Sequence, residues 1–278
     1  MMQTTVDLAA RLWAESLISL WAGFILAGLA VEYFFGTTQP VRRVWLNVRV
    51  SFVYAVIIFA LGPFVFVTTN ALASKVGLGF IDLSWLSNQS VAAQIGLALL
   101  NLFILDFFIY WFHRMQHTIG WMWDIHLVHH SDEDINVTTT TLHSWLHFIV
   151  LSAWVALPMS VLFKLPEVSS AIIGTTLAGW MFVTHLNVKL SLGRWSWLVV
   201  GPQLHRIHHS AMPQHFNKNF AGYFPIWDIL FGTYWEPASS EYPPTGVPGT
   251  VVRTVTEATI YPFKRWILLA RAKITASE

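Results

Sequence analysis

The chain lacks cysteine and has little charge. None of its 278 residues is cysteine, and only 11% are charged. The absence of cysteine excludes disulfides, iron–sulfur clusters and thiolate zinc sites. Soluble domains are usually about 25% charged, so a charge this low beside 55% hydrophobic residues indicates a membrane protein. The net charge of +1 offers no basic surface for nucleic acid, so we expect no nucleic-acid partner.

Five apolar stretches have lengths near the roughly 20 residues that cross a bilayer. Two of them are separated only by the polar sequence KLPE and predict a hairpin of membrane helices at about residues 145–188. The predicted spans are Leu12–Phe35, Ser51–Ala71, Val91–Phe112, Trp145–Phe163 and Val168–Val188. We therefore expect an all-α, multi-pass membrane bundle of about four to five spans.

Basic residues predict the orientation, because cytoplasmic loops carry an excess of Lys and Arg. Placing the loop after the first span and the C-terminal region in the cytoplasm leaves only Arg11, Lys75 and Lys164 outside. The same orientation puts every histidine-rich segment on the cytoplasmic side, as a helical cap on the bundle. The sequence has no lysine-rich C-terminal retrieval signal, which favours a bacterial cytoplasmic membrane over the endoplasmic reticulum.

The composition divides the chain into three regions. Residues 1–100 are expected to form N-terminal transmembrane helices, and residues 101–240 a histidine-rich catalytic region that includes the hairpin. Residues 241–278 begin with a loop rich in Pro and Gly. The helix predicted after this loop mixes apolar and basic residues, so it either lies along the membrane surface or packs as an ordinary helix.

Histidines are abundant where charge is scarce, and most of the 12 fall into three clusters. The first cluster has the spacing HxxxH, and the other two have the spacing HxxHH. They are His113 and His117, then His126, His129 and His130, then His205, His208 and His209. Residues three and four apart share a helix face, so each motif aims two or three imidazoles at one point. Imidazole binds iron, zinc, copper and nickel, and eight ligands are enough for two metal ions.

Other metal folds lack their motifs in this sequence. No HExxH occurs, which excludes a zinc protease of that type, and no ExxH occurs, which excludes a carboxylate-bridged di-iron bundle. A histidine-only site for two metals at one membrane face remains. Two alternatives stay open: a histidine-rich metal carrier or transporter, and a zinc-dependent membrane hydrolase or structural metal scaffold. A transporter would favour polar ligands near the bilayer midplane, and a hydrolase would favour a general base in the motif.

The order HxxxH, HxxHH, HxxHH on an apolar chain resembles the integral-membrane fatty acid hydroxylase/sterol desaturase superfamily. Three segments carry the resemblance: DFFIYWFHRMQH at Asp106–His117, HHSDEDINVTT at His129–Thr139 and NFAGYFPIWDILFGTYW at Asn219–Trp235. The resemblance implies that the eight clustered histidines bind two iron ions, which zinc can replace in purified protein. It implies an O₂-dependent oxidoreductase that hydroxylates or desaturates an unactivated C–H bond of a sterol, fatty acyl or ether lipid. A separate ferredoxin, cytochrome or reductase would supply the electrons.

The resemblance also implies a ninth metal ligand, His185, on the helix before the last cluster. The remaining histidines, His143, His147 and His215, have no counterpart in it. The pair 143 and 147 is four residues apart and could face the site. For this pair we expect a position beside the ligands or on the surface, and we expect replacement of His215 by alanine to have little effect.

Three residues are candidates to support the ligands. Asp106 lies on the helical face of His113 and is expected to accept a hydrogen bond from an imidazole N–H, which would fix its tautomer. Alternatively, Asp106 pairs with Arg114 or with a nearby Tyr or Trp. Asn187 and Asp228 are weaker candidates, and Asp228 could equally cap a helix or anchor nearby backbone.

Overall fold

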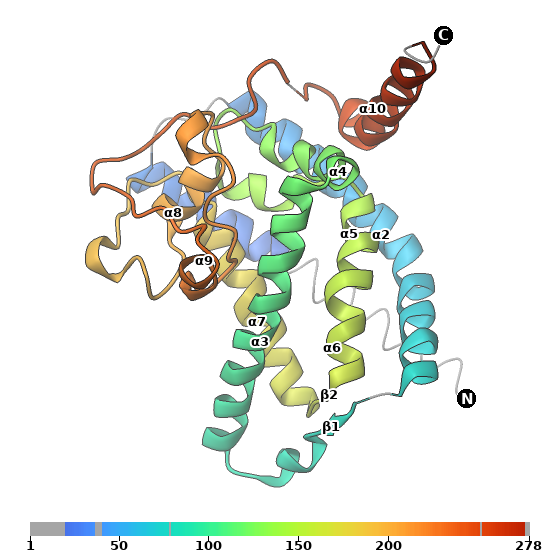
Figure 1. The fold of residues 1–278 in the computed structure, drawn as a ribbon. Coiled ribbons are helices and arrows are strands. Elements are labelled where there is room, and N and C mark those ends of the chain that lie inside the picture. Colours follow the sequence, from blue (N-terminus) through green and yellow to red (C-terminus); the bar gives the residue numbers. More distant parts are fainter. Residues whose placement is uncertain (1–19, 37–40, 78, 251, 276–278) are drawn as a thin grey trace.

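Helices form most of the protein. A computed structural model describes residues 20–36, 41–77, 79–250 and 252–275 (Figure 1). The long helices are α2 (Val41–Val76), α3 (Val91–Thr118), α7 (Glu167–Thr184) and α10 (Val255–Thr275). The shorter helices are α4 (Gly120–His130), α5 (Leu146–Leu151), α6 (Leu157–Leu162), α8 (Pro202–His208) and α9 (Ile226–Leu230). The prediction of a mostly helical fold is confirmed.

Two of the described helices are long and apolar enough to cross a membrane. They are Arg43–Val76 within α2 and Val91–Thr118, which is α3. Three shorter apolar helices coincide with the other predicted spans: Leu20–Phe35, Leu146–Leu162 and Ile173–Thr184. Residues 12–19 of the first predicted span lie outside the described residues. The described part of the chain thus contains two full-length candidate spans, and four to five spans remain a prediction.

The first arm of the predicted hairpin is interrupted. Between α5 and α6 lies a π-helical turn, η3 (Ser152–Ala156). Pro158 lies two residues after the end of this turn; it has no N–H to donate, and its ring crowds the carbonyl of Trp154. A π turn absorbs this disturbance without ending the helix. The arm is therefore continuous but irregular.

One end of the bundle carries a short strand pair, and the histidine-bearing helices lie toward the other end (Figure 1). At one end, strand β1 (Ile81–Asp82) pairs in parallel with strand β2 (Phe163–Lys164). This pairing brings the loop between α2 and α3 onto the tip of the hairpin, where Lys164 donates to Asp82 at 3.0 Å. The histidine-bearing helices α4 and α8 lie toward the other end, in the upper part of the view. The predicted topology requires this separation; which end faces the cytoplasm stays a prediction.

Short helical turns and α10 complete the end that carries the histidines. Helix α10 packs on α4 and α2, where Ala258 joins a core with Val50, Val128 and Leu142. The 3₁₀ turns within the described residues are η1 (Ser84–Asn88), η2 (Val137–Thr141), η4 (Gly193–Trp195) and η5 (Pro213–His215). On α10, Leu268 is 58% exposed, so part of its apolar face is left uncovered by the described chain.

A buried carboxylate fixes the start of α2 to the segment that follows α4. Asp132 has no exposed surface and accepts from Asn47 at 2.8 Å and from Thr139 at 2.6 Å. Arg43 lies 3.2 Å from its other oxygen, and Arg43 also donates to the carbonyl of Val252 at 2.8 Å. A buried carboxylate is stable only when its charge and lone pairs are matched. This network therefore connects α2, the end of α4 and the segment before α10.

We predict that Arg43→Leu lowers the free energy of unfolding by about 3 kcal/mol, because it leaves the buried charge of Asp132 without its cation. The matched control is Arg49→Leu, which removes the same charge from an exposed position on the same helix. Denaturant unfolding of both variants in detergent, followed by circular dichroism, measures the difference. Equal stability of the two variants would contradict this account of Asp132.

Candidate metal centre

Nine buried or half-buried histidines come together in two groups. The first group has five members and the second has four; within each group, one nitrogen per ring lies within 4.8 Å of the others. The first group is His113, His117, His126, His130 and His208, and the second is His129, His185, His205 and His209. These are the eight clustered histidines of the sequence and His185. Helices α3, α4 and α8 each contribute two or more of them, and His185 caps the end of α7.

Each HxxHH motif divides its histidines between the two groups. In α4, His126 and His130 join the first group and His129 joins the second. Helix α8 and its C-cap His209 do the reverse: His205 and His209 join the second group and His208 joins the first. The expectation that all three imidazoles of a motif converge on one point is therefore wrong. Adjacent helical residues point about 100° apart, whereas residues four apart differ by only about 40°.

The distances between ring nitrogens match those around a shared metal ion. In the first group, Nε2 of His130 lies 3.1 Å from Nε2 of both His126 and His208. In the second, Nε2 of His185 lies 3.2 Å from that of His129 and 3.0 Å from that of His205. Metal–imidazole bonds of about 2.0–2.1 Å place neighbouring nitrogens about 3 Å apart on one ion. Both groups therefore fit one metal ion each.

The hydrogen bonds of the rings leave the Nε2 atoms of several histidines free to bind a metal ion. Nδ1 of His113 donates to the carbonyl of Phe220 at 2.8 Å, and Nδ1 of His208 donates to that of Lys218 at 2.9 Å. In the second group, the Nδ1 atoms of His129 and His185 donate to the carbonyls of Leu142 and Met181, at 3.2 and 2.7 Å. A carbonyl oxygen only accepts, so each of these rings carries its proton on Nδ1 and keeps a free lone pair on Nε2.

Burial keeps the imidazoles neutral, which is the form that binds metals. It lowers the pKa of His130, His208 and His209 well below the usual value, and the neighbouring imidazoles lower it further. Neither ring nitrogen of His209 has a hydrogen-bond partner in the part of the chain that the structure describes. A buried polar atom without a partner costs about 1–3 kcal/mol. A metal ion on one nitrogen of His209 would remove that cost, so the donor set fits a metal.

Two carboxylates hold the segment that carries the carbonyl acceptor of His113. Asp228 accepts the backbone N–H groups of Phe220 and Ala221 at 2.8 and 2.9 Å. Asp106 accepts the next three N–H groups, those of residues 222–224, at 2.7–3.0 Å. Five successive N–H groups are therefore fixed by two buried acids, and this arrangement positions the Phe220 carbonyl against His113.

The predicted contact of Asp106 with an imidazole is not what the structure contains. Both of its oxygens accept hydrogen bonds from backbone N–H groups. These three donors lie in a turn and would otherwise lack a partner. For Asp228, the structure has the expected alternative of a backbone anchor, supplemented by the Thr233 hydroxyl at 2.6 Å. Both acids act on His113 through the backbone of residues 220–224.

Asn187 connects the segment after His185 to helix α8. Its carbonyl oxygen accepts from Arg206 at 3.2 Å and from the hydroxyl of Tyr242, and its amide donates to Asp134 at 3.2 Å. Arg206 adjoins His205 in the chain and lies over the ring of Tyr242. None of these bonds joins Asn187 to an imidazole, so it acts on the histidines through α8.

Sequence reasoning missed Glu32. One of its oxygens accepts the N–H of Val137 at 2.7 Å and the N–H of Asn187 at 2.8 Å. It thus ties the helix Leu20–Phe35 to the segments that follow two of the histidine-bearing helices. The signal was available, because a lone carboxylate within a predicted apolar span is costly and usually has a specific role.

The three other histidines have different environments. The His143 ring stacks on His129 with 4.3 Å between centroids and on His147 with the same separation. The Nδ1 of His147 also accepts from the amide of Gln116 at 3.0 Å. With His126 of the first group, these two also form a third, smaller group whose ring nitrogens lie within 4.8 Å of one another, so they lie directly beside the nine. His215 is buried, belongs to none of the groups and bonds to Ser210 and Glu241.

Comparison with known proteins gives one family and several relatives. Residues 98–233 match the model of the fatty acid hydroxylase family, which confirms the predicted resemblance. Alkylglycerol monooxygenase of Xenopus tropicalis is 37% identical over 131 residues, which are 46% of this chain and 28% of that protein. The human alkylglycerol monooxygenase is 36% identical over 129 residues, again 46% of this chain and 28% of the relative. Ornithine lipid hydroxylase OlsE of Rhizobium tropici is 29% identical over 197 residues, 70% of this chain and 58% of the relative.

The matched region thus spans little more than a quarter of the alkylglycerol monooxygenases and somewhat more than half of OlsE. No solved structure gives a significant match.

We predict that His208→Ala and His209→Ala impair different metal sites, although the two residues are adjacent. Loss of His208 should lower the metal occupancy of the first group, and loss of His209 that of the second. Elemental analysis gives the loss per chain, and Mössbauer spectra of iron-loaded protein identify the site that is lost. Loss of the same spectral component in both variants would contradict the division of the motif.

We predict that Asp228→Asn lowers the metal affinity of the first group by about 10- to 100-fold, because an amide cannot accept both N–H groups that hold Phe220 in place. The second group should change much less. The control is Asp82→Asn, which alters an exposed carboxylate at the opposite end of the bundle. Metal titration of the apoprotein measures both affinities, and equal weakening of the two groups would exclude this role.

Proposed function

Because residues 98–233 belong to the fatty acid hydroxylase family, we propose that this protein is a membrane-bound di-iron oxygenase that hydroxylates a lipid. The observation that supports it most is the sorting of nine histidines into two groups of metal-binding geometry. The net reaction is R–H + O₂ + 2 electrons + 2 protons → R–OH + H₂O. The two electrons come from a separate ferredoxin, cytochrome or reductase.

Two bound iron ions would supply the redox chemistry that activates O₂ for attack on an unreactive C–H bond. The protein's own contribution is to hold the ligands and to exclude water. The carbonyls of Phe220, Lys218, Leu142 and Met181 orient one imidazole each. Seven of the nine rings are buried and the other two are half-buried, which protects a reactive site from bulk solvent and from side reactions.

A lipid substrate and hydroxylation are supported by the relatives. Their names describe a monooxygenase of alkylglycerols and a hydroxylase of ornithine lipids, so we favour hydroxylation over desaturation. A metal carrier or a zinc hydrolase is supported less, because neither accounts for similarity to these oxygenases. We place the substrate among membrane lipids with a polar headgroup.

The proposed lipid hydroxylase also implies an arrangement in the membrane. We propose that the apolar helices span the cytoplasmic membrane of a bacterium in four to five passes, with the histidine end facing the cytoplasm. The two long candidate spans and the separation of the two loop tips from the histidines support this topology. Helix α10, with its exposed Ile267, Leu268 and Leu269, lies along the membrane surface.

We predict about two iron ions per chain in protein purified after expression in iron-replete medium, as two histidine groups require. His129→Ala should lower the iron content and abolish O₂-dependent lipid oxidation. His215→Gln is the matched control, because His215 is a buried histidine outside both groups, and it should retain the iron. Elemental analysis and mass spectrometry of extracted lipid provide the two readouts. Full activity in His129→Ala, or no stoichiometric metal in the wild type, would overturn the proposal.

A further inference from the structure

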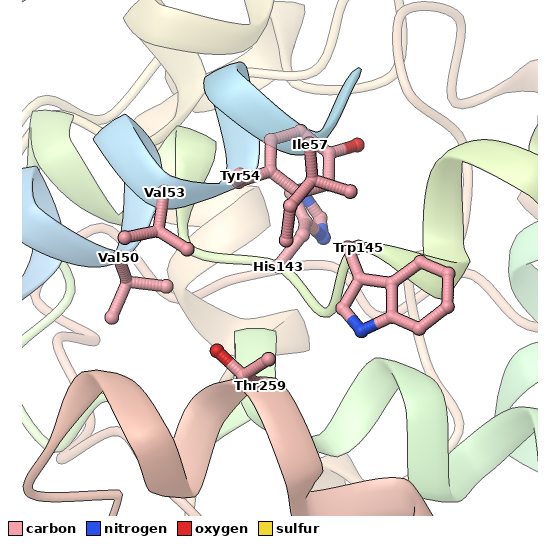
Figure 2. A pocket seen from close by; sticks show the side chains of 7 residues that line it. All are labelled: Val50, Val53, Tyr54, Ile57, His143, Trp145 and Thr259. Carbon is pink, nitrogen blue, oxygen red and sulfur yellow. The ribbon is translucent and has the colours of Figure 1, made fainter. Parts of the chain in front are cut away.

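The space between α2 and α10, beside the histidine groups, is too small for a lipid chain. Figure 2 shows this space, which is lined by His143 together with Tyr54, Trp145 and Thr259. The cavity is about 10 Å³, which is room for about one water molecule. In Figure 1, helix α9 lies on the other side of α3 from α2 and α10. The apolar surface of the histidine end that is open to a larger partner lies there, at α9.

Residues 219–235, which contain α9, are almost free of charge, and we call them the apolar segment. Among these 17 residues the only charged side chain is that of Asp228, which is fully buried. Three consecutive apolar residues, Ile229, Leu230 and Phe231, are exposed, and Leu230 is 62% exposed. Neighbouring exposed apolar side chains mark a surface that contacts a partner or a membrane. The position of the segment along α3 decides between these two.

The apolar segment packs along the middle of α3. The centroid of the Trp227 ring lies 4.5 Å from that of Phe103 and 5.0 Å from that of Phe107. The Phe224 ring lies 5.4 Å from that of Phe103. Phe103 precedes His113 by ten residues, which is about 15 Å along a helix. The segment therefore extends well away from the metal ligands, toward the centre of α3.

The depth of these contacts in a bilayer follows from the length of α3. The helix has 28 residues, and about 20 residues cross the hydrocarbon core. Any stretch of about 20 consecutive residues of α3 includes positions 99–110. Phe103 and Phe107 therefore lie inside the hydrocarbon core wherever the bilayer is placed along α3, and the part of the apolar segment that packs on them lies at the same depth. Leu99, one turn from Phe103 on the same face of α3, is 54% exposed and continues this surface.

Irregular backbone at this depth needs hydrogen-bond partners from the protein, because the hydrocarbon core holds no water. The apolar segment begins as an irregular turn, and five of its N–H groups are bound by Asp106 and Asp228. Gly222 allows the turn to approach α3, because a Cβ there would lie 3.1 Å from a carboxylate oxygen of Asp106. A carboxylate in the middle of a spanning helix is costly and usually has a specific role. Asp106 takes the place of the water that would otherwise solvate this turn.

The two ends of the apolar segment meet near the histidine end of α3. The N–H of Asn219 donates to the carbonyl of Thr233 at 3.0 Å, and the side-chain oxygen of Asn219 accepts from the N–H of Trp235 at 2.8 Å. The Thr233 hydroxyl bonds to that of Tyr110 at 2.9 Å, and Tyr110 lies one turn before His113. The segment therefore leaves the level of the metal ligands, turns at α9 and returns to that level.

We propose that the apolar segment is a re-entrant membrane segment, which enters the leaflet on the histidine side, turns at α9 and returns to the same side. Its three exposed apolar residues contact the acyl chains of that leaflet, and Asp106 anchors its turn to α3. The assignment rests on the proposed membrane arrangement, in which α3 spans the bilayer, and adds a lipid-contacting surface beside the histidines. The carbonyl of Phe220, in the same segment, orients His113, so one element both contacts the bilayer and positions a metal ligand.

The experiment measures the depth of single spin labels, because the chain has no cysteine of its own. The protein is loaded with zinc, which is d¹⁰ and therefore diamagnetic, and reconstituted in vesicles of phosphatidylethanolamine and phosphatidylglycerol. Power-saturation EPR compares the collisions of each label with O₂, which enters hydrocarbon, and with the polar chelate nickel EDDA, which does not. The variants are Leu230→Cys in the apolar segment, Leu99→Cys on α3 as the lipid reference, and Phe216→Cys as the control. Phe216 is an exposed apolar residue outside the segment, beside the polar residues Gln214 and Asn217.

We expect the label at 230 to resemble the label at 99, with a nickel EDDA collision rate at least about 5-fold lower than that of the label at 216. If the label at 230 resembles the label at 216 while the label at 99 lies in lipid, the re-entrant segment is overturned and the spanning helix stands. A label at 99 that nickel EDDA reaches overturns the membrane arrangement and the segment with it. A label at 230 that neither reagent reaches shows that protein, such as a second copy of the chain, covers α9, which also overturns the segment. Equal zinc content of the variants shows that the fold is retained.

Asp106→Asn tests the anchor, because an amide has a single acceptor oxygen and cannot replace the two oxygens that bind three N–H groups. In this variant we expect the nickel EDDA collision rate of the label at 230 to rise about 3-fold or more, since the turn is no longer held at depth. The label at 99 should be unchanged. Asp82→Asn, at the opposite end of the bundle, is the matched control. An unchanged label at 230 in Asp106→Asn would exclude the anchoring role.

Discussion

Nine imidazoles can bind metal ions in two small volumes only if the ring nitrogens that face one another carry lone pairs and no protons. A proton on each inward Nε2 would set donors against donors at about 3 Å, and a positive charge on the rings would make the contact worse. The structure meets this constraint by placing carbonyls outside the groups, where Nδ1 of His113, His129, His185 and His208 can donate. Burial then keeps the rings neutral. The positions of the surrounding loops depend on this requirement.

The buried acids serve the loops rather than the rings. Asp106 and Asp228 hold residues 220–224, and Glu32 holds the backbone beside Val137 and Asn187. Asp132 holds the segment after the first HxxHH motif. A carboxylate in contact with a metal-binding imidazole would make it a stronger donor, whereas one bonded to the backbone fixes geometry without adding charge at the ligand. Among the described residues, the side chains that would hold the proposed metal ions are then imidazoles.

The sequence by itself predicted the helical class, the nine histidines that come together and the resemblance to the fatty acid hydroxylase family, because each depends on local features: apolar length, spacing along one helix and short motifs. It could not decide how the histidines divide, since residues 129 and 130 are neighbours in the chain but point about 100° apart on the helix. It also misassigned Asp106 and overlooked Glu32, because their partners lie more than 100 positions away. Only the tertiary structure brings such residues together, since long-range hydrogen bonds leave no periodic signal in a single sequence.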